Sequence, residues 1–507
     1  MSSQLFATKS LRQLLDEMAG ENRLRRVLGP VQLTSLGVGA IIGAGIFVAT
    51  GAAAHNVAGP ALMLSYVVAG VTCIFAALCY AEFASMVPVA GSAYTYAYAT
   101  LGELFAWMIG WDLILEYAVG AATVANGWSG YFQSVLAKFG IVLPTALAGP
   151  PIVYDTAAGH FVRTGGVINV PAILIVTLVT IVLVKGIQES ASFNATMVFI
   201  KVAAVFFVIL VGAFYVNPAN WRPFAPYGMS GVSFFGKSIA GQVNAGGQPV
   251  GMLAGAAIIF FAYIGFDSVS THAEEAKRPN RDVPVGIIAS LLICTVLYIA
   301  VVAVLTGMVR YDQLSIDAGV SDAFKKSGLP WAEFIIAAAG VAGITSVLLV
   351  LMLSAPRVFL AMARDGMVPR AFFSDVHPRF RTPWRSTILV GSFVALMTGF
   401  LPIDALLHMT NIGTLFAFAI VCAAVLIMRR TNPDAERPFR APLYPVVPIL
   451  GIVSCLLLMF SLPVENWYRL LVWMAIGFVI YFTYSYHHSE LRNREEPELP
   501  RVAARSR

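Results

Sequence analysis

Apolar residues run along this chain in a dozen stretches of about 20 residues, separated by short breaks rich in charged residues, proline or glycine. A helix of that length spans the roughly 30 Å hydrocarbon layer of a bilayer. The pattern therefore predicts an all-α polytopic membrane protein with 12 transmembrane helices, at 31–55, 60–87, 100–127, 166–186, 192–216, 251–273, 284–308, 332–362, 386–401, 403–428, 442–462 and 466–486. The breaks, at most about 35 residues long, are too short for a second globular domain.

The composition excludes a soluble enzyme. Of the 507 residues, 58% are hydrophobic and only 12% are charged, against roughly a quarter charged in an ordinary soluble domain. The five cysteines all lie inside apolar stretches, without the spacing of a metal knuckle or a disulfide framework, and we interpret them as packing residues. The sequence predicts no prosthetic cofactor and no metal site.

The placement of the 33 lysines and arginines predicts the topology. If the N-terminus is cytoplasmic, 24 of them lie on the cytoplasmic side, 8 on the opposite side and one, Lys201, within a span. By the positive-inside rule both termini are cytoplasmic, in a multi-pass protein of the plasma (inner) membrane. The net charge of +6 thus reflects topology, and we expect no nucleic-acid partner. The N-terminus lacks a cleavable signal-peptide pattern, so the first span must itself target the chain.

Two sets of five spans are alike in length and in their first helix. Spans one to five cover about 185 residues and spans six to ten about 178, and each set opens on a glycine-rich segment. Because five is odd, the second copy must enter the membrane from the opposite side. We therefore expect an N-terminal cytoplasmic segment (1–30), a first repeat (31–216), an inverted second repeat (251–428), two accessory helices (442–486) and a cytoplasmic tail (487–507).

The first span contains four glycines in nine residues near its middle: Gly37, Gly39, Gly43 and Gly45. Each glycine costs a helix about 1 kcal/mol. One interpretation is close helix packing, since Gly39 and Gly43 have the small-xxx-small spacing. The other is that the helix unwinds around residues 43–45, so that free backbone N–H groups hold a carboxylate and unpaired carbonyls accept from an ammonium. A dinucleotide fingerprint is excluded, because no strand or soluble βαβ unit surrounds the glycines.

The sixth span carries a similar interruption. It reads FFAYIGFD, with Gly265 and Asp267 inside the apolar stretch and with Gly251 and Gly255 upstream. Two glycine-interrupted helices at equivalent positions of two repeats point to a substrate site between them, at the middle of the membrane. The aromatic residues beside Gly265 are either core filling or a gate over a small ligand.

Four segments resemble the amino acid-polyamine-organocation superfamily, closest to its bacterial cationic-amino-acid-transporter-type branch. They are GVGAIIGAGIF, YAEFASMVPVAGSAYTYAYATLGELFAWMIGWDLILEY, FFAYIGFDSVSTHAEEAKRPNRDVP and SAPRVFLAMARDGMVP, in order and with fitting spacing, and the resemblance runs from about residue 30 to residue 485. It implies twelve helices with a leucine-transporter-like 5+5 inverted repeat plus two C-terminal helices. It also implies transport of free amino acids by alternating access.

The resemblance also assigns site residues. It places the substrate carboxylate on the turn at residues 43–45 and the ammonium on the carbonyls of Ile41, Phe261, Ala262 and Ile264. The full substrate-binding set is Ile41, Ile42, Gly43, Ala44, Gly45, Phe261, Ala262, Tyr263 and Ile264. Relatives often have a hydroxyl residue where Ala44 stands, so the carboxylate here would rely on backbone N–H groups, with weaker or altered binding as a result.

Lys201 is the only lysine or arginine inside a predicted span. A cation at the centre of a transmembrane helix costs about 2.5–3.5 kcal/mol. Snorkelling is the alternative, but Lys201 lies about nine residues, or ~13 Å, from the cytoplasmic end, and a lysine stem covers only part of that distance. In proton-coupled members of the resembled family, a lysine on the fifth helix bridges the broken first helix and the eighth. We therefore expect Lys201 to gain and lose the coupling proton.

Three acidic residues and one aromatic residue complete the predicted pocket or gate. Glu116 lies near the middle of the third span without a basic neighbour in sequence, and would meet a bound proton or a cationic side chain. Asp267 and Glu116 fall where the resembled family has acidic residues near the substrate and the gate, and Phe266 is one of the aromatic residues that would form a gate beside the sixth-span glycines. Glu82 ends the second span, in the family's cytoplasmic-gate stretch. Each carboxylate is alternatively a solvated charge at a helix end.

These features favour proton-coupled symport of neutral apolar amino acids, since Ile41, Phe261, Ile264 and the stretch 344–355 imply an apolar pocket. Glu116 leaves a cationic amino acid carrier open, and Lys201 argues against an obligate exchanger. A membrane-embedded enzyme or a solute sensor is a distant alternative, because the seven histidines form no catalytic constellation in the sequence and the tails are too short for an output domain. The expected partners are a small-molecule amino acid and the lipid bilayer, with protons as the coupling ion.

Overall fold

The helices of the computed structural model follow the apolar stretches, and each of the twelve predicted ranges contains helix. The structure describes residues 5–9, 28–86, 92–155, 160–185, 191–235, 237–271, 273, 276–316, 319–380 and 382–491. Within these ranges, seven helices are long and apolar enough to cross a membrane, and four further apolar helices are shorter. Such an architecture is that of a multi-pass membrane protein.

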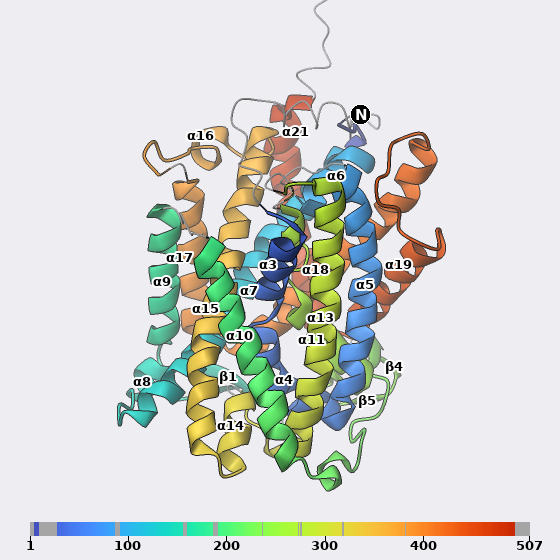
Figure 1. The fold of residues 1–507 in the computed structure, drawn as a ribbon. Helices are drawn as coiled ribbons and strands as arrows, with labels where there is room; N and C mark the ends of the chain where they lie inside the picture. Colours follow the sequence, from blue (N-terminus) through green and yellow to red (C-terminus); the bar gives the residue numbers. More distant parts are fainter. Residues whose placement is uncertain are drawn as a thin grey trace, which may run out of the picture.

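The long helices run roughly along one direction of the molecule (Figure 1). In the first half of the chain the helices are α3 (Pro30–Ile41), α4 (Thr50–Ala53), α5 (Leu62–Met86), α6 (Ser92–Thr100), α7 (Glu103–Lys138), α8 (Thr145–Ala148), α9 (Val170–Lys185) and α10 (Ala191–Gly212). In the second half they are α11 (Met252–Ile259), α12 (Ser268–Thr271), α13 (Pro279–Met308), α14 (Gly319–Lys326), α15 (Pro330–Arg364), α16 (Arg370–Phe373), α17 (Trp384–Phe400) and α18 (Ile403–Thr431). They are followed by α19 (Val446–Met459), α20 (Val464–Ile480) and α21 (Tyr486–His488).

Three short antiparallel hairpins lie in the loops, so the all-α expectation holds for the spans but not for every connection. They pair β1 (Ile152–Asp155) with β2 (His160–Arg163), β3 (Val232–Phe234) with β4 (Lys237–Ala240), and β5 (Gln242–Val243) with β6 (Pro249–Val250). In Figure 1 the labelled strands β1, β4 and β5 lie with α8 and α14 near one end of the molecule, whereas α6, α16 and α21 lie at the other.

The helices pack in two groups joined by two further helices. One group contains α7, α9, α15 and α17, and the other contains α3, α5, α11 and α13. The first linking helix, α10, packs against α3, α13 and α15. The second, α18, packs against α5, α7 and α11. The centre of the molecule is therefore lined by segments from both halves of the chain.

The helix α7 is longer than the predicted third span at 100–127. It continues to Lys138, which pairs with Glu333 of α15, and on the way the Trp128 indole donates to the hydroxyl of Thr345 at 2.9 Å. The chain leaves the helix before Gly140, which has a φ of +75°. The last turns of α7 pack against α15.

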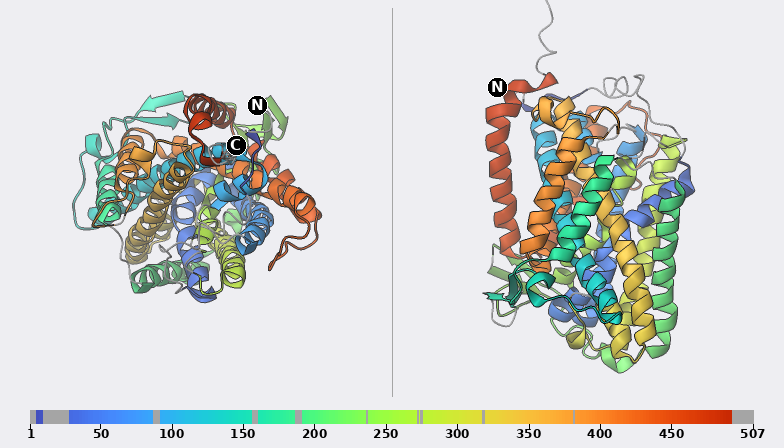
Figure 2. Two further views of the ribbon diagram at one scale, coloured as in Figure 1. Left: turned by 90° about the horizontal axis from the view of Figure 1, so that it is seen from above. Right: turned by 90° about the vertical axis from the view of Figure 1, so that its left-hand side faces the viewer.

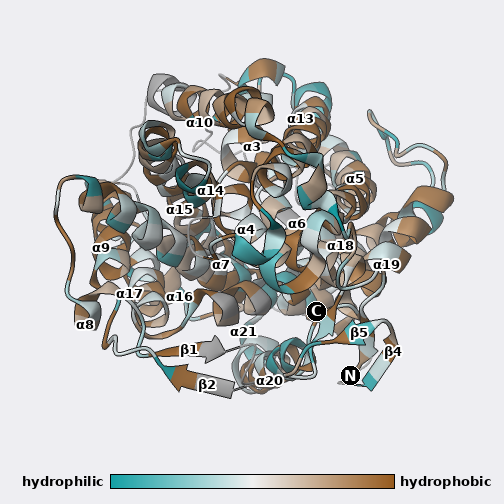
Figure 3. Ribbon diagram, turned by 90° about the horizontal axis from the view of Figure 1, so that it is seen from below, coloured by the Kyte–Doolittle hydropathy of each residue, from teal (hydrophilic) through white to brown (hydrophobic). Residues whose placement is uncertain are grey.

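The outer faces of the peripheral helices are apolar, and Figure 3 shows mainly hydrophobic colours along α9, α10 and α19. Exposed side chains on these helices are large and apolar: Leu174, Leu178, Ile181, Phe199, Phe206, Leu210, Ile449, Leu450 and Val453. A soluble protein rarely exposes such continuous apolar surface. These faces are suited to contact with lipid chains.

The helix α20, predicted as accessory, lies at the edge of the bundle in both views of Figure 2 but is firmly attached to α7. The rings of Trp111 and Trp473 stack with their centroids 4.3 Å apart. Each indole N–H donates to the main-chain carbonyl of the other residue, at 2.9 and 3.0 Å. A third indole, that of Trp107, donates to Gly477 O at 3.0 Å. These contacts tie the twelfth predicted span to the third.

Residues from the two ends of the described chain meet at the end of α15, and we call Lys9, Glu103, Asp365, Ser489 and Glu490 the terminal cluster. Lys9 Nζ donates to Asp365 Oδ1 at 2.5 Å, and the backbone N–H of Glu490 donates to Asp365 O at 3.1 Å. The carboxylate of Glu103, at the start of α7, accepts from the hydroxyl of Ser489. Segments from both ends of the sequence thus close one end of the bundle together.

Candidate functional site

The first apolar helix is interrupted near its middle. The helix α3 ends at Ile41, and Ile42 has φ −70° and ψ 108°, an extended conformation. The chain resumes as a π-helical turn at Gly45–Ala49, which continues into α4. The first N–H groups of a helical segment have no intrahelical partner. The turn at Gly43, Ala44 and Gly45 therefore presents backbone donors that can bind an anion.

The sixth apolar helix is interrupted as well. The helix α11 ends at Ile259, a 3₁₀ turn covers Phe260–Tyr263, and Ile264 is extended with ψ 132°. Gly265 then adopts a φ of +117°, a conformation that other residues reach only with strain. Helical structure returns at Ser268, the first residue of α12. The break covers the predicted residues Phe261, Ala262, Tyr263 and Ile264, which are all buried.

The two interruptions lie against each other, and glycines make the contact possible. A Cβ on Gly45 would lie 2.2 Å from the Cα of Ala262, and one on Gly265 would lie 2.9 Å from the carbonyl oxygen of Ala40. A Cβ on Gly43 would lie 2.4 Å from Val347 of α15. The first helix thus both unwinds and packs closely at these glycines, while the binding of a carboxylate and an ammonium there stays a prediction.

One hydroxyl group joins the two interruptions. The side chain of Tyr298, on α13, donates to Ile41 O at 2.8 Å and to Ala262 O at 3.1 Å. A hydroxyl has a single hydrogen, which the two carbonyls share, while each carbonyl keeps a second lone pair. Two of the carbonyls expected to accept an ammonium are thus already held at a fixed separation by the protein itself.

Lys201 is completely buried on α10, between the first and eighth predicted spans. Its Nζ donates to the carbonyl oxygen of Gly39 in α3 at 2.5 Å. Its aliphatic stem packs on Gly343 of α15, where an added Cβ would lie 3.1 Å from Lys201 Cγ. Within the part of the chain that the structure describes, it forms no ion pair with a carboxylate. A buried lysine in this setting can exchange a proton without losing a salt bridge.

Asp267, two residues after Gly265, holds the backbone of the sixth-helix break. Its Oδ1 accepts from the backbone N–H of Gly265 at 3.2 Å, and its Oδ2 accepts from the hydroxyl of Tyr117 on α7 at 2.9 Å. The side chain is buried, so it is not a solvated charge at a helix end. Asp267 therefore fixes the irregular backbone and links it to the third predicted span.

Glu116 and Asp112 lie one turn apart on α7, and both carboxylates are buried. Glu116 faces Thr414 on α18, yet neither of its carboxylate oxygens makes a hydrogen bond to a described residue. Asp112 has one such oxygen, Oδ2. A buried carboxylate of this kind is suited to contact with a cationic group. The structure brings Glu116 and Asp267 close enough to interact electrostatically.

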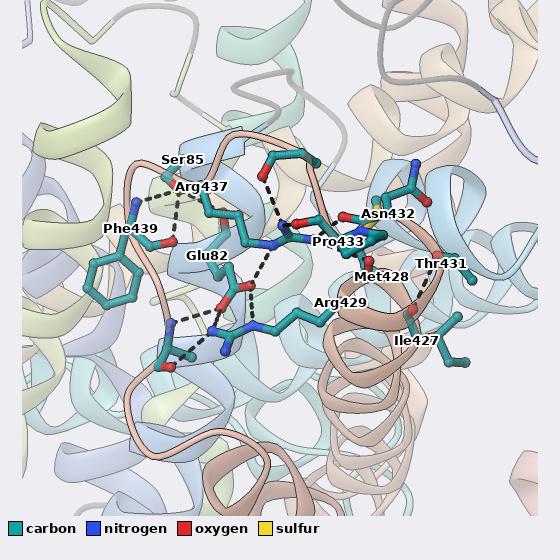
Figure 4. Close-up of polar contacts among 12 residues, drawn as sticks. Glu82, Ser85, Ile427, Met428, Arg429, Thr431, Asn432, Pro433, Arg437 and Phe439 are labelled. Carbon is teal, nitrogen blue, oxygen red and sulfur yellow. Dashed lines mark hydrogen bonds and ion pairs between the residues drawn. The ribbon is translucent and has the colours of Figure 1, made fainter.

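Glu82 lies away from the interruptions, in a buried ion-pair cluster at the end of α5 (Figure 4). Arg429 donates to both of its oxygens, at 2.9 and 2.6 Å, and the backbone N–H of Ala441 donates to Oε2 at 2.8 Å. The guanidinium of Arg437 lies 3.4 Å from Oε1, and burial lowers the pKa of Arg437, while Glu82 acts in the opposite direction. In this structure Glu82 anchors the loop between α18 and α19 to α5.

The predicted aromatic residues are buried in ring clusters. Phe266 packs with Phe418 of α18 and Tyr80 of α5, at centroid distances of 5.0 and 6.0 Å. Tyr263 donates its hydroxyl to Tyr66 O at 2.9 Å and lies 5.6 Å from the ring of Tyr298. Both rings serve as core filling here, and the sixth-helix break is surrounded by aromatic side chains.

The structure adds two residues that the sequence analysis did not single out. Tyr298 joins the interruptions, and Asn411 of α18 donates to carbonyls at the end of α11. Both are polar side chains within predicted spans, and a carboxamide such as that of Asn411 inside a span is itself a signal of an interhelical hydrogen bond. Among the described residues, no group of three or more histidine, cysteine or acidic side chains is placed to hold a metal ion.

Comparison with known proteins gives relatives along nearly the whole chain. The family model "Amino acid permease" matches residues 28–482. A methylthioribose transporter of Bacillus subtilis is 44% identical over 489 residues, which is 96% of this chain and 99% of that protein. A branched-chain amino acid permease of the same organism is 46% identical over 492 residues, or 97% and 100% of the two chains. Human cationic amino acid transporter 4 is 36% identical over 431 residues, covering 83% of this chain and 63% of that protein.

These findings confirm the resemblance carried by the four sequence motifs. The relatives are named as transporters or permeases, which also confirms the prediction of a carrier rather than an enzyme. With interrupted helices, an apolar exterior and a family match over most of its length, the chain belongs to the amino acid permease family of the amino acid-polyamine-organocation superfamily.

Proposed function

We propose that this protein is a secondary active transporter that carries free amino acids by alternating access, with the substrate held between the two interrupted helices. The observation that carries the proposal is the contact between them, where Gly45 lies against Ala262 and Tyr298 hydrogen-bonds a carbonyl on each side. Backbone donors at the first interruption suit a carboxylate, and backbone carbonyls suit an ammonium. One zwitterionic head group satisfies both.

The substrate class is the neutral amino acids with an apolar side chain, the branched-chain ones in particular. Beside the sixth-helix break, an added Cβ on Gly120 of α7 would lie 3.5 Å from Leu351, 3.6 Å from Thr410 and 3.9 Å from Phe261. Four elements thus meet at a largely apolar surface, which suits a hydrocarbon side chain. The similarity to a branched-chain amino acid permease supports the same class.

Two other substrates have an observation in their favour. Buried Glu116, without a donor among the described residues, suits the side chain of a cationic amino acid, and cationic amino acid transporters are among the relatives. Methylthioribose has neither carboxylate nor ammonium, so the backbone groups at the interruptions would bind its hydroxyls instead. Both substrates belong in the same assay as leucine.

Transport is coupled to protons through Lys201. Its ammonium donates to Gly39 O, just before the first interruption, so loss of the proton replaces a charge-assisted hydrogen bond on this helix with a weaker neutral one. Its burial and the lack of an ion-paired carboxylate in the described residues support this role. An obligate exchanger would have no use for such a proton.

In this proposal the chain crosses the plasma membrane twelve times, as two inverted five-helix repeats and two further helices. The helix found in each predicted range and the interruption of the first helix of each repeat support it. Both termini are cytoplasmic. The bias of lysines and arginines supports this orientation, and so does the terminal cluster, which lies near α21 at one end of the molecule (Figure 1). Single cysteines in place of exposed Arg440 and exposed Lys326 test it, because a membrane-impermeant maleimide added to intact cells should label only the second.

The central experiment is uptake into liposomes that contain the purified protein. Counterflow is measured with labelled leucine, lysine and methylthioribose, and net uptake is measured with and without an inward pH gradient. We expect leucine counterflow without a gradient and leucine accumulation only with one. Counterflow of methylthioribose alone would overturn the amino acid assignment. Leucine counterflow with no response to the gradient would leave an exchanger and overturn proton coupling.

A further inference from the structure

Asn411 connects the tenth predicted span to the sixth-helix break. It lies on α18, its side chain is completely buried, and its Nδ2 donates to two successive carbonyls of α11, Ala257 O at 2.9 Å and Ile258 O at 2.7 Å. These are the last carbonyls before Ile259, where the α-helix ends. Both amide hydrogens are therefore used on the segment that leads into the break.

The carbonyls of Ala257 and Ile258 need an external donor because the helix does not continue. In an unbroken helix they would accept from N–H groups four residues later, within Phe260–Tyr263. Those residues form a 3₁₀ turn instead, so the last α-helical carbonyls lose regular partners in a place without water. The backbone N–H of Phe260 reaches Ile258 O, and the amide of Asn411 donates to both carbonyls, so it supplies hydrogen bonds that the ended α-helix no longer provides.

The orientation of the amide follows from its partners. Asn411 Oδ1 has no hydrogen-bond partner among the described residues, although the side chain is buried. A flipped amide would set this oxygen against two carbonyl oxygens and leave the N–H groups unused. The protein accepts one unsatisfied oxygen so that both carbonyls of α11 are held.

The same part of α18 also contacts the acidic residues of α7. Gly413 lies against Asp112, whose Oδ1 would be 2.6 Å from an added Cβ, and Thr414 faces Glu116. Asn411 and Thr414 are three residues apart, which places them one turn from each other on the helix. One turn of α18 thus contacts both the sixth-helix break and the buried carboxylates of the third span.

We propose that Asn411 is a positioning residue for transport: its two amide hydrogens set the place and direction in which the sixth helix breaks, and so the position of the carbonyls that face the substrate. This inference rests on the proposed function. It assigns to α18 a part in forming the substrate site from outside the interrupted helices. Asn411 itself need not touch the substrate.

Two nearly isosteric variants test the role of the hydrogens. Asn411→Leu removes all polar atoms, and Asn411→Asp keeps the acceptor but loses the N–H donors. We expect both to raise the KM for leucine about tenfold or more, with a smaller change in the maximal rate, because the ligand carbonyls are misplaced. Leucine should also protect both variants against thermal unfolding only at correspondingly higher concentrations.

The matched control is Asn126→Asp. Asn126 is also a buried amide, and it donates to Leu401 O at 3.1 Å, at the junction of α17 and α18, away from the interruptions. A structural effect alone would lower the thermal midpoint of this variant and leave its KM for leucine as in the wild type. Should either Asn411 variant fail to accumulate, Asn411→Ser, which is smaller and keeps one donor, replaces it and is expected to give an intermediate KM.

The outcomes separate this inference from the proposed function. Absence of leucine counterflow in the wild type overturns the proposed function. Wild-type counterflow with an unchanged KM in the Asn411 variants overturns the role of Asn411 alone.

Discussion

The two interrupted helices differ in the groups that hold them. At the first, a lysine ammonium and a tyrosine hydroxyl donate to the carbonyls of Gly39 and Ile41. At the sixth, the amide of Asn411 donates to α11, and the carboxylate of Asp267 accepts from Gly265. A lysine ammonium carries an exchangeable proton that can be lost in a transport cycle, whereas an amide does not titrate.

The first interruption thus has a support that can change, the ammonium of Lys201, whereas the sixth has a constant support, the amide of Asn411. Under the proposed function, a proton that leaves Lys201 alters only the first helix, while Asn411 keeps the sixth in place. The substrate would then be released when one wall of its site changes, and the other wall would remain as a template for the next molecule. Three variants can break or sharpen this difference.

The largest effect is expected from Lys201→Ala. Without the ammonium, Gly39 O has no proton-dependent donor, so accumulation driven by a pH gradient should disappear, while counterflow at equal pH persists. Uptake into liposomes with and without the gradient measures both. Lys185→Ala, an exposed lysine at the end of α9, serves as the control and should retain accumulation. Gradient-driven accumulation by Lys201→Ala would contradict the hypothesis that the proton of Lys201 controls the first interruption.

A smaller but substantial effect is expected from Gly45→Ala. The new methyl group would meet the backbone of Ala262 at 2.2 Å, and the backbone cannot rotate away as a side chain can. Overpacking of this kind costs about 1–3 kcal/mol, so the two interruptions should separate and uptake should fall roughly tenfold. Initial uptake rates and the thermal midpoint are the measurements. Gly149→Ala, where nothing lies within 4 Å, should change neither.

The smallest of the three effects is expected from Tyr298→Phe, which removes the one hydroxyl shared by the two interruptions. Loss of one hydrogen bond is worth about 1 kcal/mol, which corresponds to roughly a fivefold increase in the KM for leucine. Tyr481→Phe, a buried tyrosine that donates to Glu103 at 2.9 Å, should leave this KM unaltered. An unaltered KM in Tyr298→Phe would mean that the interruptions are positioned independently of each other.

The backbone of the site was more predictable than its supports. Glycine density predicts both interruptions because glycine weakens a helix locally, wherever the segment lies in the fold. The position of Lys201 between the first and eighth spans was implied by a family resemblance and by the cost of a buried charge. Both are properties of a short stretch of sequence.

The supporting contacts depend on helix packing, which no local pattern describes. Tyr298 and its acceptor Ile41 are 257 positions apart, and Asn411 and Ala257 are 154 apart. The same holds for Glu82: the sequence places it at the end of a span, but its partner Arg429 lies 347 positions later and could not be predicted from the local pattern. The continuation of α7 beyond the predicted span, where it packs against α15, is likewise a matter of contact between distant segments.

The terminal cluster has a consequence for biogenesis. Lys9 leaves the ribosome 356 residues before its partner Asp365, and Glu103 leaves it 386 residues before Ser489. Until Asp365 and Ser489 have been synthesised, Lys9 and Glu103 lack these contacts. Polar groups of an incompletely folded chain are then exposed to chaperones and proteases. A product truncated before Asp365 would therefore lack the partner of Lys9, and one truncated before Ser489 would lack that of Glu103, both at the same end of the bundle.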